Sequence, residues 1–104
     1  NGIQFEYTDN VNSGRWSAVT TSSSTSTVVN SSVAVAANTW YRVRMDVNAA
    51  GTLVTFSIND VVIGTASTNI PTSTAVRHKG HIQKTAGSTS CTLSIDYVGW
   101  IQIR

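Results

Sequence analysis

The chain has few of the residues that cross-link, interrupt or charge a polypeptide. Among its 104 residues it has one cysteine, one proline and one methionine. The single cysteine, Cys91, excludes an internal disulfide. Its setting between serine and threonine predicts a small, half-buried strand position in preference to a reactive thiol. The single proline, Pro71, lies in a polar segment that predicts a loop.

Charge is equally scarce, and this limits the classes of partner. Charged residues make up 12% of the chain and its net charge is +2, so charged residues occur at about half their usual frequency. The basic residues form no run, and we therefore expect no nucleic-acid partner. No apolar stretch approaches the roughly 20 residues that span a bilayer, and we expect no membrane insertion.

Length and composition together predict one domain over residues 1–104. Serine, threonine and asparagine take the place of lysine and glutamate, which is typical of extracellular or particle-surface β proteins. The chain begins with asparagine and its methionine is Met45. We therefore expect a segment of a longer polypeptide.

A two-residue period predicts strands in the middle of the chain. From Trp40 to Val47, apolar residues at odd positions alternate with charged ones, and Leu53–Asn59 alternates in the same way. Side chains alternate across a strand, so each segment predicts one apolar and one polar face, with Tyr41, Val43, Met45 and Val47 inward beside Val54, Phe56 and Ile58. Asn48–Gly51 predicts a hairpin connection, and Asn59–Asp60 predicts a turn into a third strand at residues 61–66.

The rest of the chain predicts further short strands and no long helix. They are expected at residues 3–8, 15–21, 26–35, 76–84 and 93–103, with residues 20–27 as a polar hairpin or edge. Residues that are β-branched dominate and favour strands over helices. About seven to eight antiparallel strands predict an all-β sandwich or barrel.

The stretch from Asn38 to Pro71 resembles a known family. It reads Asn-Thr-Trp-Tyr-Arg-Val-Arg-Met-Asp-Val-Asn, then Ala-Ala-Gly-Thr-Leu-Val-Thr-Phe-Ser-Ile-Asn-Asp-Val-Val-Ile, then Thr-Asn-Ile-Pro. This wording is similar to the core of concanavalin A-like (laminin-G-like) jelly rolls, and the later Ser-Ile-Asp-Tyr-Val resembles their last core strand. One departure is Asp60, where the family's hairpin usually has glycine.

The resemblance implies a jelly-roll β-sandwich with a structural or binding role. Jelly-roll domains with this sequence pattern occur in bacteriophage tail fibres, tail spikes and capsid-decorating virion proteins, some of which contact host glycans. We therefore expect a virion structural domain, a homo-oligomer or one bound to other virion proteins, located on the virion surface or outside the cell. The alternative is a lectin-like carbohydrate-binding module of a secreted enzyme or adhesin.

Catalytic and metal-binding patterns are weak in this sequence. A β-sandwich glycosidase needs two facing carboxylates, but Glu6 is the sole glutamate and the acids follow no alternating motif. Asp46 shares a predicted face with Arg42 and Arg44, which predicts an ion pair. His78 and His81 point to opposite faces of a regular strand and predict no metal chelation. We expect no enzyme, metal site or cofactor.

The candidate binding residues combine aromatic rings with groups that hydrogen-bond sugar hydroxyls. Six residues form this set, with glycan contact and packing in the core or against another subunit both left open: Trp40, Arg42, Arg44, Glu6, Trp16 and Trp100. Trp40, Arg42, Arg44 and Asp46 are predicted to share one strand face, with Gln4 and Glu6 as neighbours.

Overall fold

The computed structural model describes residues 2–72, 93–95 and 99. The chain divides into two compact units, Asn1–Thr74 and Ala75–Arg104. Every strand described here belongs to the first unit. The prediction of one domain over residues 1–104 stays a prediction, because the second unit lies almost wholly outside the described residues.

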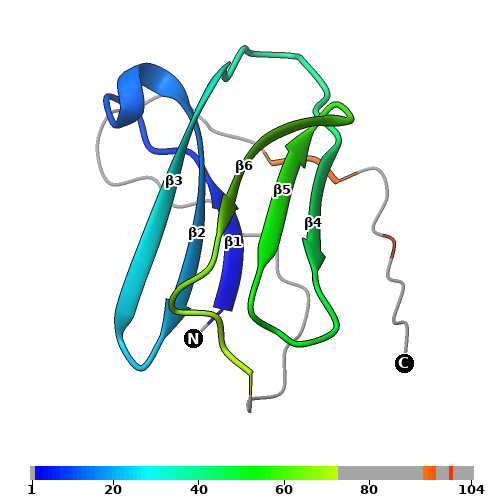
Figure 1. The fold of residues 1–104 in the computed structure, drawn as a ribbon. Helices are drawn as coiled ribbons and strands as arrows, with labels where there is room; N and C mark the ends of the chain where they lie inside the picture. The colour runs from blue at the N-terminus through cyan, green and yellow to red at the C-terminus, as the bar shows by residue number, and fades with distance from the viewer. Residues whose placement is uncertain (1, 73–92, 96–98, 100–104) are drawn as a thin grey trace. The chain divides into compact units, whose positions relative to one another are not determined.

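The described residues form an all-β structure, as predicted. The strands are β1 (Gly2–Glu6), β2 (Arg15–Ser22), β3 (Thr25–Ala34), β4 (Val43–Val47), β5 (Val54–Ile58) and β6 (Val61–Ala66) (Figure 1). One short 3-10 turn, η1 (Asn12–Gly14), precedes β2. The described part of the chain thus has six strands where seven to eight were expected, and the predicted strand at residues 76–84 lies outside it.

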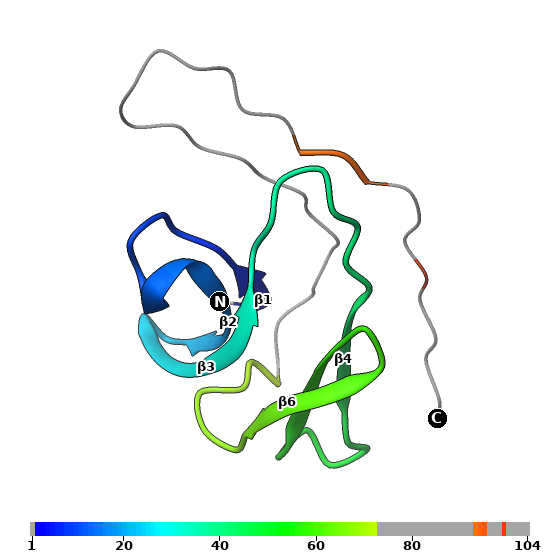
Figure 2. The same ribbon diagram turned by 90° about the horizontal axis from the view of Figure 1, so that it is seen from above.

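The strands form two antiparallel sheets of three, each a simple meander. One sheet has the order β1-β2-β3 and the other the order β4-β5-β6. Figure 2 shows the first sheet curling in an arc, with β6 of the second sheet passing near β3. Within each sheet, consecutive strands are neighbours because each connection is a hairpin or a short loop, whereas the segment between β3 and β4 passes from one sheet to the other.

Residues with positive φ explain the tight hairpin turns. Asn59 (φ 52°) and Asp60 (φ 66°) connect β5 to β6, and Ser23 (φ 51°) and Ser24 (φ 66°) connect β2 to β3. Two successive residues with positive φ give the turn twist that matches antiparallel strands. Gly51 (φ 69°) closes the β4–β5 connection. The predicted connections at Asn48–Gly51 and Asn59–Asp60 are therefore confirmed, and of the two interpretations for residues 20–27 the structure shows the hairpin.

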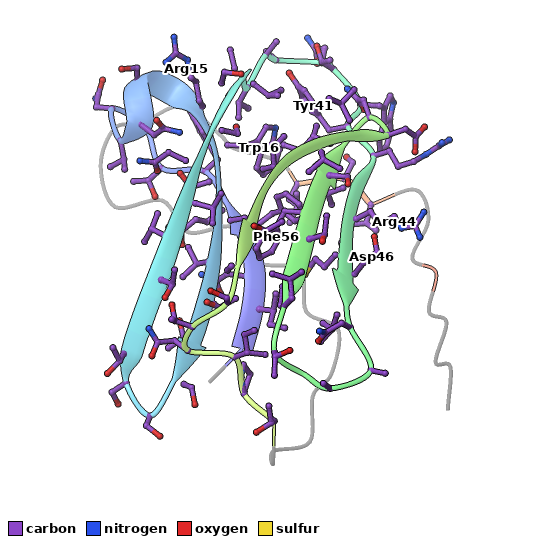
Figure 3. All side chains as sticks on the ribbon, in the orientation of Figure 1. Arg15, Trp16, Tyr41, Arg44, Asp46 and Phe56 are labelled. Carbon is purple, nitrogen blue, oxygen red and sulfur yellow. The ribbon has the colours of Figure 1, made fainter. Side chains whose placement is uncertain are left out.

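One apolar cluster joins the two sheets. Ala18 of β2 packs with Val54, Phe56 and Ala66 of the second sheet. The ring of Phe5 on β1 meets that of Phe56 edge to face, with centroids 5.4 Å apart. Figure 3 shows Phe56 between the two sheets. The predicted inward side of β5 is confirmed, since Val54, Phe56 and Ile58 are all buried.

For β4, the prediction that the odd-numbered residues are buried is wrong, although they lie on the predicted face. Val43, Met45 and Val47 pair with Ile58, Phe56 and Val54 and so share their face of the sheet. Yet they are 42%, 41% and 48% exposed. Alternation fixes the face that a residue occupies, whereas burial requires atoms opposite that face. Tyr41 is half-buried and lies before the strand.

Two other strand boundaries differ from the prediction. Ile3 and Phe5 pack against the core, but β1 ends at Glu6 and Tyr7 is exposed. Residues 93–95 have no regular secondary structure, and Leu93 and Ile95 are exposed. Alternation can stabilise a strand only where a neighbouring strand binds its backbone groups. The remainder of the strand predicted at residues 93–103 lies outside the described residues, apart from Gly99.

Candidate binding face at strand β4

The outer face of β4 carries a charged pair. The Arg44 guanidinium lies 2.9 Å from the Asp46 carboxylate, and both side chains are largely exposed. The two residues are two apart on one strand and therefore point to the same side. In Figure 3 both side chains lie beside β4 and point away from Phe56. The predicted ion pair of Asp46 is confirmed with Arg44 as the partner.

A second charged pair links the start of β4 to the β5–β6 turn. Arg42 Nη1 lies 3.0 Å from Asp60 Oδ2. The Arg42 backbone N–H donates to Asn59 Oδ1 at 3.0 Å, and the Asn59 N–H donates to the Arg42 carbonyl at 2.7 Å. Three contacts thus hold Arg42 against the turn. The sequence did not indicate the partnership of Arg42 with Asp60, because it depends on the hairpin that folds the turn back onto β4.

Trp40 lies in the loop before β4 and not on the strand. Its side chain is 67% exposed. The loop is fixed by Tyr41, whose hydroxyl donates to the Ala34 carbonyl and accepts from the Ala36 N–H, both at 2.9 Å. These bonds hold the backbone in a loop, so the strand begins at Val43. The prediction that Trp40 and Arg42 lie on the strand with Arg44 is therefore corrected.

Trp16 on β2 packs against this loop. Its ring meets that of Tyr41 edge to face, with centroids 5.7 Å apart and an interplanar angle of 71° (Figure 3). The indole Nε1 is buried and has no hydrogen-bond partner among the described residues. Trp16 thus contributes to packing between β2 and the loop. The role of Tyr41 in joining them was missed, because its alternation with Val43 indicated only a strand.

Glu6 lies elsewhere on the molecule. Its carboxylate accepts a hydrogen bond from Gln4 Nε2 at 2.9 Å on β1. That strand belongs to the other sheet, and Phe5 between them points into the core. Gln4 and Glu6 therefore face away from the shared core on the opposite side from Arg44, and the predicted neighbourhood with Trp40 is wrong. Trp100 lies outside the described residues.

Other polar groups near the first strand make local contacts only. Loss of solvation around the phenol, followed by the Asp9 carboxylate and its hydrogen bond with the phenol, raises the pKa of Tyr7 above the ordinary 10.0. The two oxygens are 3.4 Å apart. Within the described residues no cluster of three histidine, cysteine or acidic side chains could hold a metal ion. No helix in that same part of the chain is long and apolar enough to span a membrane.

The three described acids outside the Tyr7–Asp9 contact are engaged singly. Asp46 and Asp60 each face one arginine, and Glu6 faces an amide. What the arrangement offers is an exposed indole and two exposed arginine–aspartate pairs along the edge of one sheet. Such groups can stack on an apolar ring face and exchange hydrogen bonds with hydroxyl or charged partners.

Comparison with known proteins yields a family assignment over most of the chain. Residues 1–96 match the family model described as SO2946-like, C-terminal domain. No curated protein and no solved structure matches the chain.

Proposed function

The chain belongs to the family of SO2946-like C-terminal domains, and we propose that it is a structural domain of a virion-surface protein. In this proposal it is a non-catalytic jelly-roll sandwich of a tail fibre, tail spike or capsid-decorating protein. Its role is to present a rigid β surface at the outside of a particle.

The observation that carries this proposal is the fold of residues 43–66. This stretch lies within the segment whose amino-acid sequence resembles virion-associated jelly rolls. It forms the meander β4-β5-β6, with Gly51 and the Asn59–Asp60 turn at its two connections. These are the strand, glycine turn and hairpin that the resemblance implies for that segment. The support concerns the fold, and the virion role follows from the resemblance.

The charge arrangement supports a non-catalytic role. A pair of carboxylates that cleaves a glycosidic bond lies about 5–9.5 Å apart and flanks the bond between them. Asp46 and Asp60 instead each form an exposed ion pair with a different arginine. Both carboxylates are solvent-exposed and face different arginines, so they do not converge on one site.

The virion role is tested on the parent polypeptide that contains this domain. Antibodies against residues 1–104 are applied to particles from the producing culture, and bound gold is located by electron microscopy. We expect labelling at fixed positions on a fibre, spike or capsid. A parent polypeptide that is secreted free or bound to cells, with no labelled particle, contradicts the proposal.

The alternative is a carbohydrate-binding module, and one observation favours it. Trp40 is 67% exposed, two residues before an arginine held in an ion pair with Asp60. An exposed indole beside a fixed arginine is suited to stacking on a sugar ring and hydrogen-bonding its hydroxyls.

A glycan array followed by calorimetry on the bound sugar tests this alternative. We expect Trp40→Ala and Arg42→Ala each to weaken binding about tenfold or more, as loss of an aromatic or charged contact of 1–3 kcal/mol would. Arg15→Ala and Val28→Ala are matched controls, because both residues are exposed on the other sheet. Equal loss in the controls, or no binding across the array, refutes the glycan role.

A further inference from the structure

Strand β4 forms an edge of its sheet among the described strands. The order of that sheet is β4-β5-β6, so one side of β4 pairs with β5. All five residues of β4 are exposed. An exposed edge presents a row of N–H and C=O groups on which another strand can pair.

The hydrogen bonds at the two ends of β4 show which residues point to the open side. The Arg42 carbonyl accepts from the Asn59 N–H, and the Asn48 N–H donates to the Leu53 carbonyl. In an antiparallel pair the backbone groups of successive residues point alternately toward and away from the neighbour. Even-numbered residues of β4 therefore bind β5, and Val43, Met45 and Val47 present their N–H and C=O groups at the open edge.

The order of charges on β4 is complementary to itself. The strand reads Val43-Arg44-Met45-Asp46-Val47. When two copies lie antiparallel with Met45 opposite Met45, each Arg44 stands opposite an Asp46 and each Val43 opposite a Val47. The three opposed pairs of odd residues can then exchange both of their N–H···O=C bonds.

Neighbouring registers are disfavoured by charge. A shift that centres the pair on Arg44 places the two arginines directly opposite each other, and one centred on Asp46 does the same with the two carboxylates. Opposite charges across a strand pair stabilise it, and like charges directly opposite destabilise it. Charges on an edge strand often prevent pairing, but on β4 their order instead selects one register.

The apolar face of β4 also favours a second copy. Val43, Met45 and Val47 are 42%, 41% and 48% exposed on the face that they share with the buried side of β5. In the Met45-centred register the two exposed apolar rows meet side by side. Burial of part of this surface adds to the backbone hydrogen bonds.

We propose that β4 pairs with β4 of a second copy of this chain, antiparallel and centred on Met45, to form one six-stranded sheet across a two-fold dimer. The residues that specify the register are Arg44 and Asp46. The proposal does not rest on the virion or glycan role, because its test measures self-association and neither particles nor sugars.

Charge reversal tests the pairing. The dimer Kd of the full chain is measured by analytical ultracentrifugation for Arg44→Asp, Asp46→Arg and the variant with both changes. We expect each single change to raise the Kd about tenfold or more, since each dimer contains two such cross-strand contacts. The double change should return the Kd to within about threefold of the original, because each opposed pair is again of opposite sign.

Controls separate pairing from folding. Arg15→Asp makes the same charge change on the other sheet and should leave the Kd unchanged, and circular dichroism should give the same β spectrum for every variant. A chain that stays monomeric into the millimolar range overturns the proposal. The proposal is also overturned if the dimer Kd is unchanged by the single substitutions, or if the double substitution does not restore it.

Disulfide trapping tests the register in a Cys91→Ser background. Met45→Cys places identical thiols on opposed residues whose Cα atoms are about 5.5 Å apart, within disulfide range. Val43→Cys is the matched control, since residue 43 has nearly the same exposure and stands opposite residue 47 of the second copy. We expect oxidation to trap a dimer at position 45 and not at 43. The reverse result, or equal trapping at both, overturns the register.

Discussion

Gly64 of β6 lies in close contact with β3 of the other sheet, and its replacement by alanine tests how the two sheets pack. A Cβ atom at position 64 would lie 2.5 Å from Val29 Cγ1. Real Cβ atoms are essentially never this close to another carbon, so one of the two strands or the valine must move. Val29 belongs to β3 and Gly64 to β6, and both lie against the core that joins the sheets.

Two opposing effects set the size of the change. Overpacking of this kind costs about 1–3 kcal/mol. Against it, the change from glycine to alanine restricts the unfolded chain and stabilises by about 0.4–1 kcal/mol where the backbone fits alanine. Gly64 does not have a left-handed φ, so this gain applies. We expect Gly64→Ala to lower the free energy of unfolding by about 1–2 kcal/mol.

A double-mutant cycle with Val29→Ala tests the cause. Removing the valine methyl groups opens the space that the new methyl needs, so Gly64→Ala should become neutral or stabilise by up to about 1 kcal/mol in that background. Urea unfolding followed by tryptophan fluorescence gives each free energy. Gly2→Ala is the control, because nothing lies within 4 Å of a Cβ at that position. An equal loss with and without Val29 refutes the close approach of β3 and β6.

Four further outcomes follow from other contacts. Asp60→Gly should stabilise the chain by up to about 1 kcal/mol in urea unfolding, because the position has φ 66° and its ion pair is exposed. Stability owed to the raised pKa of Tyr7 should be lost as pH rises through that pKa, above 10.0. Asp9→Asn should lower this pKa in carbon NMR of the tyrosine ring but leave it above 10.0, since loss of solvation is the larger cause. Met45→Ala should cost about 1 kcal/mol or less at low protein concentration, whereas Phe56→Ala should cost about 3–5 kcal/mol.

Local patterns predicted the strands and turns well. The alternation at residues 53–59 correctly predicted the burial of Phe56. Glycine and asparagine correctly predicted the turns at Gly51 and Asn59. These predictions depend on neighbours a few residues apart, whose geometry is fixed by the backbone. The ion pair of Arg44 with Asp46 belongs to the same class, because residues two apart on a strand point the same way.

Contacts between distant segments were not predictable from the same patterns. Arg42 pairs with Asp60 because the turn folds back onto the strand. Tyr41 leaves the expected strand because its hydroxyl is bound by backbone groups at the end of β3 and just after it, at residues 34 and 36. Glu6 was grouped with Trp40 although β1 belongs to the other sheet. Sheet membership is a property of the topology, and a two-residue period carries no information on it.

The exposed apolar row on β4 shows that a sequence pattern can place apolar residues on the inner face of a sheet without determining whether other atoms cover them. Met45 stands directly opposite Phe56 in the sheet, yet Phe56 is 0% exposed and Met45 41%. The two residues share a face, so the difference arises from what stands above each one, and Phe5 packs over Phe56. Edge strands that stay single are commonly protected by charged side chains, prolines or bulges that prevent pairing. Strand β4 instead keeps one apolar face and a pair of opposite charges in mirror order about Met45, and that combination satisfies its edge groups when the neighbour is the same strand reversed.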